Sequence, residues 1–212
     1  MRDASKISIL HITHIRNLPL IIKDEFLWSD KMQLTKKHCN QGIGLPHVKQ
    51  RRLNELKVTC HIGTMVGDYV PFYFHVLSPM LYYIYKRGDE LGYKGGQEDV
   101  VYLVATMSNA IEWAEKNNKK WAFTNGNAGA YLCDFYNNIK DLDKVNWEAV
   151  KQRYWTDCKD AKQSEFLLYE QFPWNIFEFI GVYDEIHKKQ VEQIIAKSTH
   201  KPTIKVEKNW YY

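Results

Sequence analysis

The chain has 212 residues, of which 45% are hydrophobic and 25% charged, with a formal net charge of +4. This balance is typical of a soluble globular protein and excludes an intrinsically disordered chain. No run approaches the ~20 apolar residues of a transmembrane helix, and the first residues lack a signal-peptide cleavage site, so we expect a cytoplasmic protein without a membrane partner.

Hydrophobic periodicity predicts strands and helices in irregular alternation. In chain order, strands are expected at residues 7–15, 70–76, 98–105, 121–124, 165–169, 177–183 and 203–207. Helices are expected at residues 47–58, 128–138, 146–154 and 185–197, and others that begin near Asn17, at Ser78-Pro79 and at Thr106 or Ser108. Asn125-Gly126-Asn127 is expected to form a turn. Several strands lie too close together for a full crossover helix, which indicates a mixed α+β fold rather than a doubly wound parallel sheet.

Residues 28–46 differ from the rest because they are polar and have few apolar anchors. Gly42, Gly44 and Pro46 favour irregular backbone, so we predict a long mobile loop of a kind that often covers a binding site. The Gly42-Ile43-Gly44 sequence lacks the third glycine and the preceding strand of a dinucleotide fingerprint, and the chain has no Walker lysine motif. A bound nucleotide therefore requires another architecture.

The four cysteines lie far apart and include no C-x-x-C pair, so neither a disulfide framework nor a zinc ribbon is indicated. Further potential metal ligands occur at residues 38–61, but their spacing matches no ordinary structural zinc site. These are His38, Cys39, His47, Cys60 and His61. We therefore expect reduced thiols and no bound metal.

Basic residues are clustered at three places along the chain. The clusters are Lys36-Lys37-His38, Lys49 with Arg51-Arg52, and Lys116 with Lys119-Lys120. The modest net charge permits a nucleic-acid partner without requiring one, and each cluster is equally consistent with a solvated surface.

Glu165 stands directly before Phe166-Leu167-Leu168, a run with the composition of a buried strand. A carboxylate at the start of such a strand is a candidate catalytic group. The alternative is a glutamate at the edge of the strand, in solvent.

Several motifs follow one another along the chain. They are His11-Ile12-Thr13-His14, Asp68 to Phe74 followed by Ser78-Pro79-Met80-Leu81, Gly96-Gln97-Glu98, Phe123-Thr124, and Ser164-Glu165 with Phe172-Pro173-Trp174. Together they resemble the motifs of the DarT-type DNA ADP-ribosyltransferases, the toxins of the DarT/DarG toxin-antitoxin family. The resemblance covers nearly the whole chain and implies an α+β fold, namely an ADP-ribosyltransferase-like split mixed β-sheet with surrounding helices and an NAD-binding cleft. It also implies one domain over residues 1–212, with a mobile loop at about 35–53 that covers NAD and a substrate-recognition loop at about 139–165.

The resemblance implies roles for individual residues. Glu165 is the expected catalytic carboxylate, placed near the NAD ribose to stabilise positive charge and to accept a proton. Arg52 is the second expected catalytic residue, because its planar donors suit the NAD pyrophosphate or the bond that breaks. Contacts with NAD are expected from His11, Ile12, Thr13, Leu20, Trp28 and Arg52.

Single-stranded DNA is the expected second substrate. Unpaired bases stack on aromatic side chains, and their phosphates meet basic ones. The residues expected to contact DNA are Tyr69, Tyr73, His75, Met80, Lys159 and Lys162. Leu10 and Gly67 depart from many family members, which have an aromatic residue and a histidine there; the departure bears on stacking and sequence preference rather than on the reaction.

The implied function is that of a toxin enzyme that moves ADP-ribose from NAD, its co-substrate, to a base in single-stranded DNA at a short sequence motif. Thymine is the expected base, and the modification is expected to block replication in growth control or phage defence. The resemblance also implies a DarG-type macrodomain antitoxin as partner. Transfer to guanine, to RNA or to protein is an alternative within the same cleft. A non-catalytic single-strand-binding module is the alternative from another class, and it would bind DNA without regard to NAD.

Overall fold

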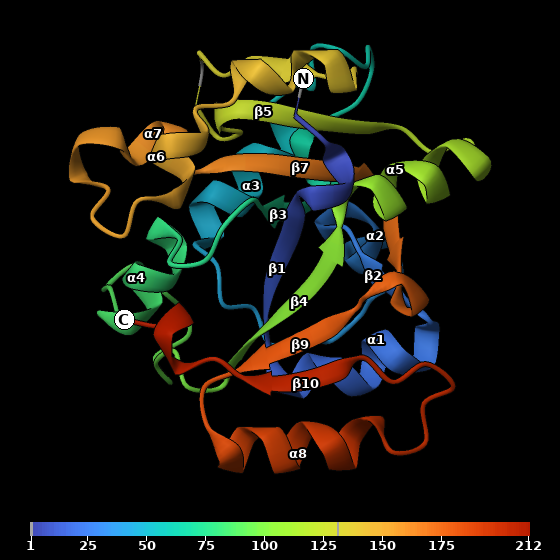
Figure 1. The fold of residues 1–212 in the computed structure, drawn as a ribbon, viewed down its shortest axis with the longest axis vertical. Coiled ribbons are helices and arrows are strands. Elements are labelled where there is room, and N and C mark those ends of the chain that lie inside the picture. Colours follow the sequence, from blue (N-terminus) through green and yellow to red (C-terminus); the bar gives the residue numbers. More distant parts are fainter. Residues whose placement is uncertain (1, 131) are drawn as a thin grey trace.

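Figure 1 shows a central sheet with helices around it in the computed structural model, which describes residues 2–130 and 132–212. The eight-stranded sheet has the order β10 (Thr203–Val206), β9 (Phe179–Val182), β4 (Val100–Thr106), β1 (Ser8–His14), β3 (Tyr69–Tyr73), β7 (Ser164–Tyr169), β5 (Trp121–Asn127) and β6 (Phe135–Tyr136). β10 and β9 are parallel, and the other neighbouring pairs in this sheet are antiparallel. A second, antiparallel sheet joins β2 (Phe26–Trp28) and β8 (Gln171–Pro173).

The helices lie between these strands in the chain. They are α1 (Leu18–Asp24), α2 (Asp30–Thr35), α3 (Pro46–Asn54), α4 (Pro79–Tyr85), α5 (Met107–Lys116), α6 (Trp147–Lys151), α7 (Lys159–Lys162) and α8 (Glu185–Ile195). Short 3₁₀ turns occur at Ala4–Lys6, Ile15–Asn17, Val66–Asp68, Ile139–Lys144, Thr156–Cys158, Trp174–Ile176 and Lys208–Trp210. The predicted mixed α+β class is therefore confirmed.

β4 is buried on both faces, because every residue from Val100 to Ala105 is buried. Val101 and Leu103 belong to the larger core cluster, which also contains the buried side chains of α1, α5 and α8. Val100 and Tyr102 belong to a second cluster that contains the buried side chains of α4. Because successive residues of a strand point to opposite faces, helices cover the sheet on both sides of β4.

β1 and β3 are neighbours but are barely paired. β1 pairs with β4 at every position from Ser8 to His14, whereas the described pairing of β1 with β3 is a single one, Leu10 with Tyr73. Pro71 in β3 contributes to this separation because it has no backbone N–H to donate. The sheet therefore splits between β1 and β3.

The loop predicted at residues 28–46 is wrong in its first part. Trp28 ends β2, and α2 begins after Ser29, whose hydroxyl accepts a hydrogen bond from the backbone N of Met32 at 3.3 Å. Ser29 is buried and caps the helix. In the sequence this N-cap serine was not distinguished from the other polar residues of the segment. Irregular backbone is confined to residues 36–45, after which Pro46 begins α3, and α3 ends at Asn54 rather than at residue 58.

β5 is longer than predicted and replaces the turn expected at residues 125–127. Its last residue, Asn127, pairs with Ser164 of β7 after a register shift. The helix predicted at residues 128–138 is wrong over its described part, because the chain instead returns to form β6 against β5; residue 131 lies outside the described residues. The other predicted elements are present, although several are shorter than expected.

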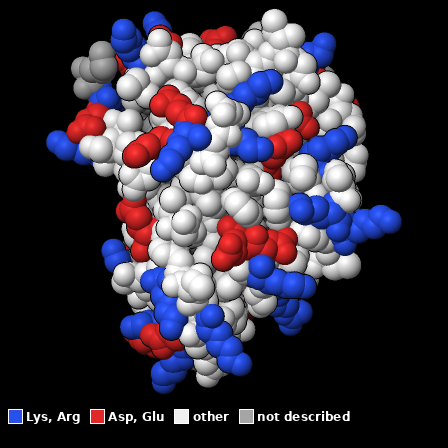
Figure 2. Space-filling view, turned by 90° about the vertical axis from the view of Figure 1, so that its right-hand side faces the viewer, with Lys and Arg blue, Asp and Glu red and all other residues white. Residues whose placement is uncertain are grey.

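Figure 2 shows the side of the molecule that lies on the right of Figure 1. Acidic and basic side chains are interspersed on this face. It is therefore unlike the one-signed basic surfaces that bind a phosphate backbone. Among the helices described, none combines the length and the apolar character that crossing a membrane requires.

Candidate active site

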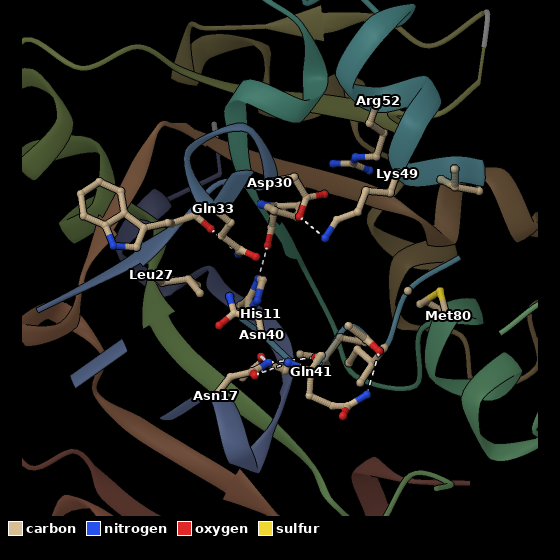
Figure 3. A pocket seen from close by; sticks show the side chains of 18 of the residues that line it. His11, Asn17, Leu27, Asp30, Gln33, Asn40, Gln41, Lys49, Arg52 and Met80 are labelled. Atoms are coloured by element: carbon tan, nitrogen blue, oxygen red, sulfur yellow. Dashed lines mark hydrogen bonds and ion pairs between the residues drawn. The ribbon is translucent and has the colours of Figure 1, made fainter. Parts of the chain in front are cut away.

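A cavity of about 460 Å³ opens at the split between β1 and β3 (Figure 3). Its walls come from these two strands, from β2 and β7, from α1, α2 and α3, from residues 36–45 and from the start of α4. This volume lies within the range of small-molecule sites. The predicted site residues that line it are His11, Ile12, Thr13, Trp28, Arg52, Tyr73, Met80 and Glu165.

Glu165 and Arg52 form a two-point ion pair in the wall of this cavity. Arg52 Nη1 donates to Glu165 Oε1 at 3.0 Å, and Arg52 Nη2 donates to Glu165 Oε2 at 2.9 Å. The two side chains are 13% and 5% exposed, so water screens their attraction weakly. Burial by itself would lower the pKa of Arg52, but the adjoining carboxylate outweighs burial and the net pKa is raised. Glu165 is therefore not the solvated strand-edge residue of the alternative interpretation.

The backbone of Glu165 is held by β5. Its N–H donates to Thr124 Oγ1 at 2.8 Å, and the Thr124 hydroxyl donates to the carbonyl of Gly126 at 2.7 Å. These bonds lie where the register between β5 and β7 shifts. The Thr124 hydroxyl thus accepts a hydrogen bond where the ladder between β5 and β7 is interrupted, and it fixes the backbone of Glu165.

Tyr73 faces Glu165 across the ladder between β3 and β7. Burial raises the pKa of Tyr73 strongly, and the charge of Glu165 raises it further. Tyr73 is therefore a neutral phenol at neutral pH, and it can donate or accept a hydrogen bond beside the carboxylate.

His11 bridges the split in the sheet. Its Nδ1 lies 2.8 Å from the carbonyl oxygen of Pro71, and its ring packs edge-on against Phe72. Burial lowers the pKa of His11, an effect that the Pro71 hydrogen bond and the charge of Asp30 oppose without cancelling. Because a carbonyl can only accept, Nδ1 carries the proton, and the neutral ring leaves Nε2 as an acceptor.

Asn17 ties residues 36–45 to the end of β1 (Figure 3). Its side-chain amide donates to the carbonyl of Gln41 and to Thr13 Oγ1, both at 3.0 Å, and its oxygen accepts from the backbone N of Gln41 at 2.8 Å. Ile43 anchors the same segment in the second core cluster. The mobility predicted for this segment is untested, but its position over the cavity has a defined anchor.

Trp28 and two charged residues complete the wall. Trp28 Nε1 donates to Asp24 Oδ2 at 2.8 Å, and the Lys36 ammonium lies 4.1 Å from the centroid of the indole. Asp30 on α2 and Lys49 on α3 form an ion pair of 2.8 Å, drawn as a dashed line in Figure 3. The indole is therefore fixed in orientation, and the two helices are joined beside Arg52.

Five predicted site residues lie outside the cavity: Leu20, Tyr69, His75, Lys159 and Lys162. Ile21 of the same helix lines the cavity, whereas Leu20 does not; the NAD contact of Leu20 stays a prediction. His75 is half-buried and Lys159 is exposed on α7; their contacts with DNA stay predictions.

Tyr69 and Lys162 are corrected as DNA contacts because both are buried. Tyr69 is 1% exposed, and its hydroxyl lies 3.0 Å from Thr64 Oγ1, so no face is open for a base. Lys162 is 3% exposed, and its Nζ donates to the carbonyls of Val76 at 3.0 Å and Val150 at 2.7 Å. Lys162 therefore joins α7 to α6 and to the segment after β3, rather than facing solvent phosphates.

Comparison with known proteins identifies the family. The family model described as DarT, ssDNA thymidine ADP-ribosyltransferase, matches residues 10–212. The chain belongs to the DarT family. A DNA ADP-ribosyl transferase of Thermus sp. (strain 2.9) is 34% identical over 209 residues, covering 96% of this chain and 95% of the relative.

Two solved DarT structures share the fold at full length. Thermus sp. 2.9 DarT in complex with ADP-ribosylated ssDNA matches with a TM-score of 0.88 and 32% identity, covering 97% of this chain and 96% of that one. Thermus sp. 2.9 DarT in complex with NAD⁺ matches with a TM-score of 0.83 and 31% identity, covering 97% and 98%. The resemblance and the ADP-ribosyltransferase-like fold predicted from sequence are both confirmed.

Some residues of this DarT cavity were not predicted from sequence, notably Asn17, Gln41, Asp30 and Lys49. Lys49 had a usable signal, because it precedes Arg52 by three residues on one helix and so shares its face. The bonds of Asn17 depend on a loop that is distant in sequence, and no local pattern marks them. In residues 2–130 and 132–212, no group of three or more His, Cys, Asp or Glu side chains is arranged to hold a metal ion.

Asn17→Ala is expected to raise the KM for NAD⁺ about tenfold with a smaller effect on kcat, because loss of the two hydrogen bonds to Gln41 releases residues 36–45 from the cavity. Initial rates of nicotinamide release at varied NAD⁺ measure this change. Asn54→Ala, at the exposed end of α3, is the matched control. An unchanged KM in Asn17→Ala would show that the anchor does not serve the cavity.

Lys162→Met is expected to act on stability rather than on DNA binding. The variant leaves the buried carbonyl of Val150 without a donor and the carbonyl of Val76 with only the longer contact to His75 Nδ1 at 3.4 Å, which costs roughly 1–3 kcal/mol of unfolding free energy. Burial lowers the pKa of Lys162 from 10.5 to about 8. The unfolded chain therefore binds more protons between these pH values, so the unfolding free energy of the native protein rises with pH there, and the variant loses this rise.

Denaturant unfolding at pH 7.5 to 10.5 and DNA titrations at several salt concentrations test Lys162→Met, with exposed Lys159→Met from the same helix alongside. The salt dependence of DNA binding is expected to be unchanged in Lys162→Met. A reduced salt dependence in that variant would show that the amine reaches phosphate after all.

Proposed function

We propose that this protein transfers the ADP-ribose group of NAD⁺ to the thymine base of thymidine in single-stranded DNA. The observation that carries the proposal is the buried pair of Glu165 and Arg52 in the wall of a cavity at the split in the sheet. Membership of the DarT family supports the reaction type and the base.

The cavity has groups that suit NAD⁺ as a substrate. Its volume is about 460 Å³, and His11 offers Nε2 as an acceptor for a ribose hydroxyl. Ile12 and Thr13 lie where β1 has parted from β3, so backbone groups on that side are available for the nicotinamide amide. Trp28 supplies an aromatic wall. The solved complex of Thermus sp. 2.9 DarT with NAD⁺ supports this assignment.

Glu165 is the proposed catalytic carboxylate. The bond between the nicotinamide nitrogen and the ribose C1′ breaks, and nicotinamide leaves with the bonding electrons. The base nitrogen supplies the electron pair for the new bond to C1′ and gives up its proton. In thymidine this nitrogen is N3, because N1 already carries deoxyribose. We assign to Glu165 both the stabilisation of positive charge on the ribose and the acceptance of the N3 proton.

Arg52 is the proposed positioning residue for Glu165. Its two terminal nitrogens each donate to one carboxylate oxygen, so the carboxylate plane is fixed by two parallel bonds. The contact of Arg52 with NAD⁺ expected from the resemblance stays part of the proposal, since Arg52 also lines the cavity.

Tyr73 and Met80 are the proposed contacts of the target base. Both line the cavity, and Tyr73 lies opposite Glu165 in the ladder. A base that brings N3 to the carboxylate therefore meets the Tyr73 side chain. His75 and Lys159 are proposed to contact DNA outside the cavity.

We further propose a DarG-type macrodomain antitoxin as the partner of this chain and the cytoplasm as its compartment. Family membership supports the antitoxin, because the DarT/DarG family pairs the transferase with an enzyme that reverses the modification. The DNA substrate supports a cytoplasmic location for the protein in any cell whose chromosome lies in the cytoplasm.

Intact masses of single-stranded oligonucleotides after incubation with the protein and NAD⁺ test the proposal. One added ADP-ribose is expected on strands that contain thymidine, and none on the same strands with every thymidine replaced. Addition to thymidine-free DNA, to RNA or to the protein would favour another acceptor. DNA binding with NAD⁺ unconsumed would favour the non-catalytic binding module.

A further inference from the structure

Four aromatic side chains from three separate segments meet beside α4. This aromatic cluster consists of Tyr82 and Tyr85 of α4, Trp155 after α6, and Tyr212. The ring of Tyr82 lies 5.6 Å from Trp155 and 5.0 Å from Tyr212, and Tyr85 stacks on Tyr212 at 6.1 Å. In Figure 1 the labelled C-terminus, α4 and the loop between α6 and α7 lie on one side of the molecule.

Hydrogen bonds hold this cluster in place without a ligand. Trp155 Nε1 donates to the Tyr212 hydroxyl at 2.7 Å, and that hydroxyl donates to the carbonyl of Leu77 at 2.6 Å. Gln97 bonds the backbone of Tyr212 at both its N–H and its carbonyl. The rings are therefore preorganised, which lowers the entropic cost of binding to them.

The cluster has an open aromatic surface with basic side chains around it. Tyr85 is 42% exposed and Tyr154, beside Trp155, is 87% exposed. The Lys86 ammonium lies 5.1 Å from the Tyr85 ring. Burial raises the pKa of Tyr212, and the positive charge of nearby Arg153 opposes that rise. Single-stranded nucleic acids bind to aromatic faces that lie next to cationic side chains, because their bases stack on the rings and their phosphates contact the cations.

The cluster and the active-site cavity share α4. α4 contributes Met80 to the cavity wall and, two residues later, Tyr82 to the cluster. The Tyr212 hydroxyl is bonded to Leu77, just before the start of this helix. A strand that leaves the cavity at Met80 and crosses α4 reaches the cluster.

We propose that the aromatic cluster, with Tyr154, Lys86 and Arg153, is the docking site for nucleotides that flank the target thymidine. The proposal rests on the proposed function, because a single strand must enter the cavity. The exposed rings stack on flanking bases, and the basic side chains meet the phosphates between them. Stacking at this site tolerates any base, since every base has a face that can stack, so the expected short sequence motif is not read here.

Two strands of equal length and charge separate stacking from phosphate contact. Both contain one target thymidine, and one of them carries abasic nucleotides in place of the flanking bases. Dissociation constants from fluorescence anisotropy are measured for each strand, and KM values for transfer are measured alongside. Wild-type protein is expected to bind the base-bearing strand about tenfold more tightly.

Tyr85→Ser and Tyr154→Ser test the rings, and Ile186→Ser, which removes a 74% exposed apolar side chain from α8, is the matched control. Each tyrosine variant is expected to lose most of the preference for the base-bearing strand, while the control keeps it. Lys86→Ser and Arg153→Ser are expected to weaken the salt dependence of binding for both strands, and Lys189→Ser on α8 to leave it unchanged.

Equal affinity of wild-type protein for the two strands would overturn the docking site. Equal weakening of both strands by Tyr85→Ser would also overturn it, because only a structural role would be left. If wild-type protein shows the preference but transfers nothing to either strand, the docking site stands and the proposed reaction fails.

Discussion

Glu165→Gln is expected to fold and to transfer ADP-ribose about a thousandfold more slowly than the native protein. The amide keeps the size of the side chain and still accepts one hydrogen bond from Arg52. It removes the negative charge that the reaction needs, and it cannot take the N3 proton. Transfer is measured under single-turnover conditions with saturating NAD⁺ and oligonucleotide, so that altered binding does not mask the chemical step.

The control for this variant is Glu170→Gln. Glu170 directly follows β7, and its carboxylate is paired with Lys119 at 2.6 Å, but it does not line the cavity. Glu170→Gln is expected to transfer at close to the native rate. Thermal unfolding of both variants establishes that they are folded. Transfer by folded Glu165→Gln within a factor of about ten of native would remove Glu165 from the catalytic role.

Arg52→Lys is expected to lower transfer about a hundredfold while retaining the positive charge. A lysine ammonium is a point charge that cannot reproduce the two parallel hydrogen bonds, so the carboxylate loses its fixed plane. Arg52→Ala is expected to destabilise the fold as well, by about 3–5 kcal/mol, because it leaves Glu165 buried without a partner.

Arg51→Lys is the matched control, because Arg51 is adjacent on α3 but donates to the carbonyl of Gly129 and pairs with Glu55. Single-turnover rates and denaturant unfolding of the three arginine variants separate positioning from stability. If Arg52→Lys transfers at the native rate, the two-point geometry has no part in the reaction.

The sequence predicted secondary structure correctly where a run of apolar residues coincides with a buried strand. The apolar residues at 100–104 and the run after Glu165 both predicted strands, and both strands are buried. The α+β class followed from the spacing of the predicted strands, because several of them lie too close together for a full crossover helix. The motifs that contain His11 and Glu165 predicted a shared cleft, and the structure brings both residues to one cavity.

Prediction failed where contacts distant in sequence override local preference. Residues 128–138 have helical composition, but β6 forms there because β5 is available to pair with it. Lys162 was expected to contact DNA because it lies in the segment that matches the family's substrate-recognition loop, yet two backbone carbonyls accept hydrogen bonds from its amine in the interior. Neither partner is adjacent to Lys162 in the chain, so no local pattern could have revealed this burial.

A crystal structure of Glu165→Gln with NAD⁺ and a thymidine-containing oligonucleotide tests the proposed placement of both substrates, because the slow variant allows them to remain intact. The nicotinamide ribose is expected in the cavity between β1 and β3, with a hydroxyl at His11 Nε2, and thymine N3 is expected to face both C1′ and the side chain at position 165. NAD⁺ bound outside this cavity, or a thymine whose N3 faces away from residue 165, would contradict this placement.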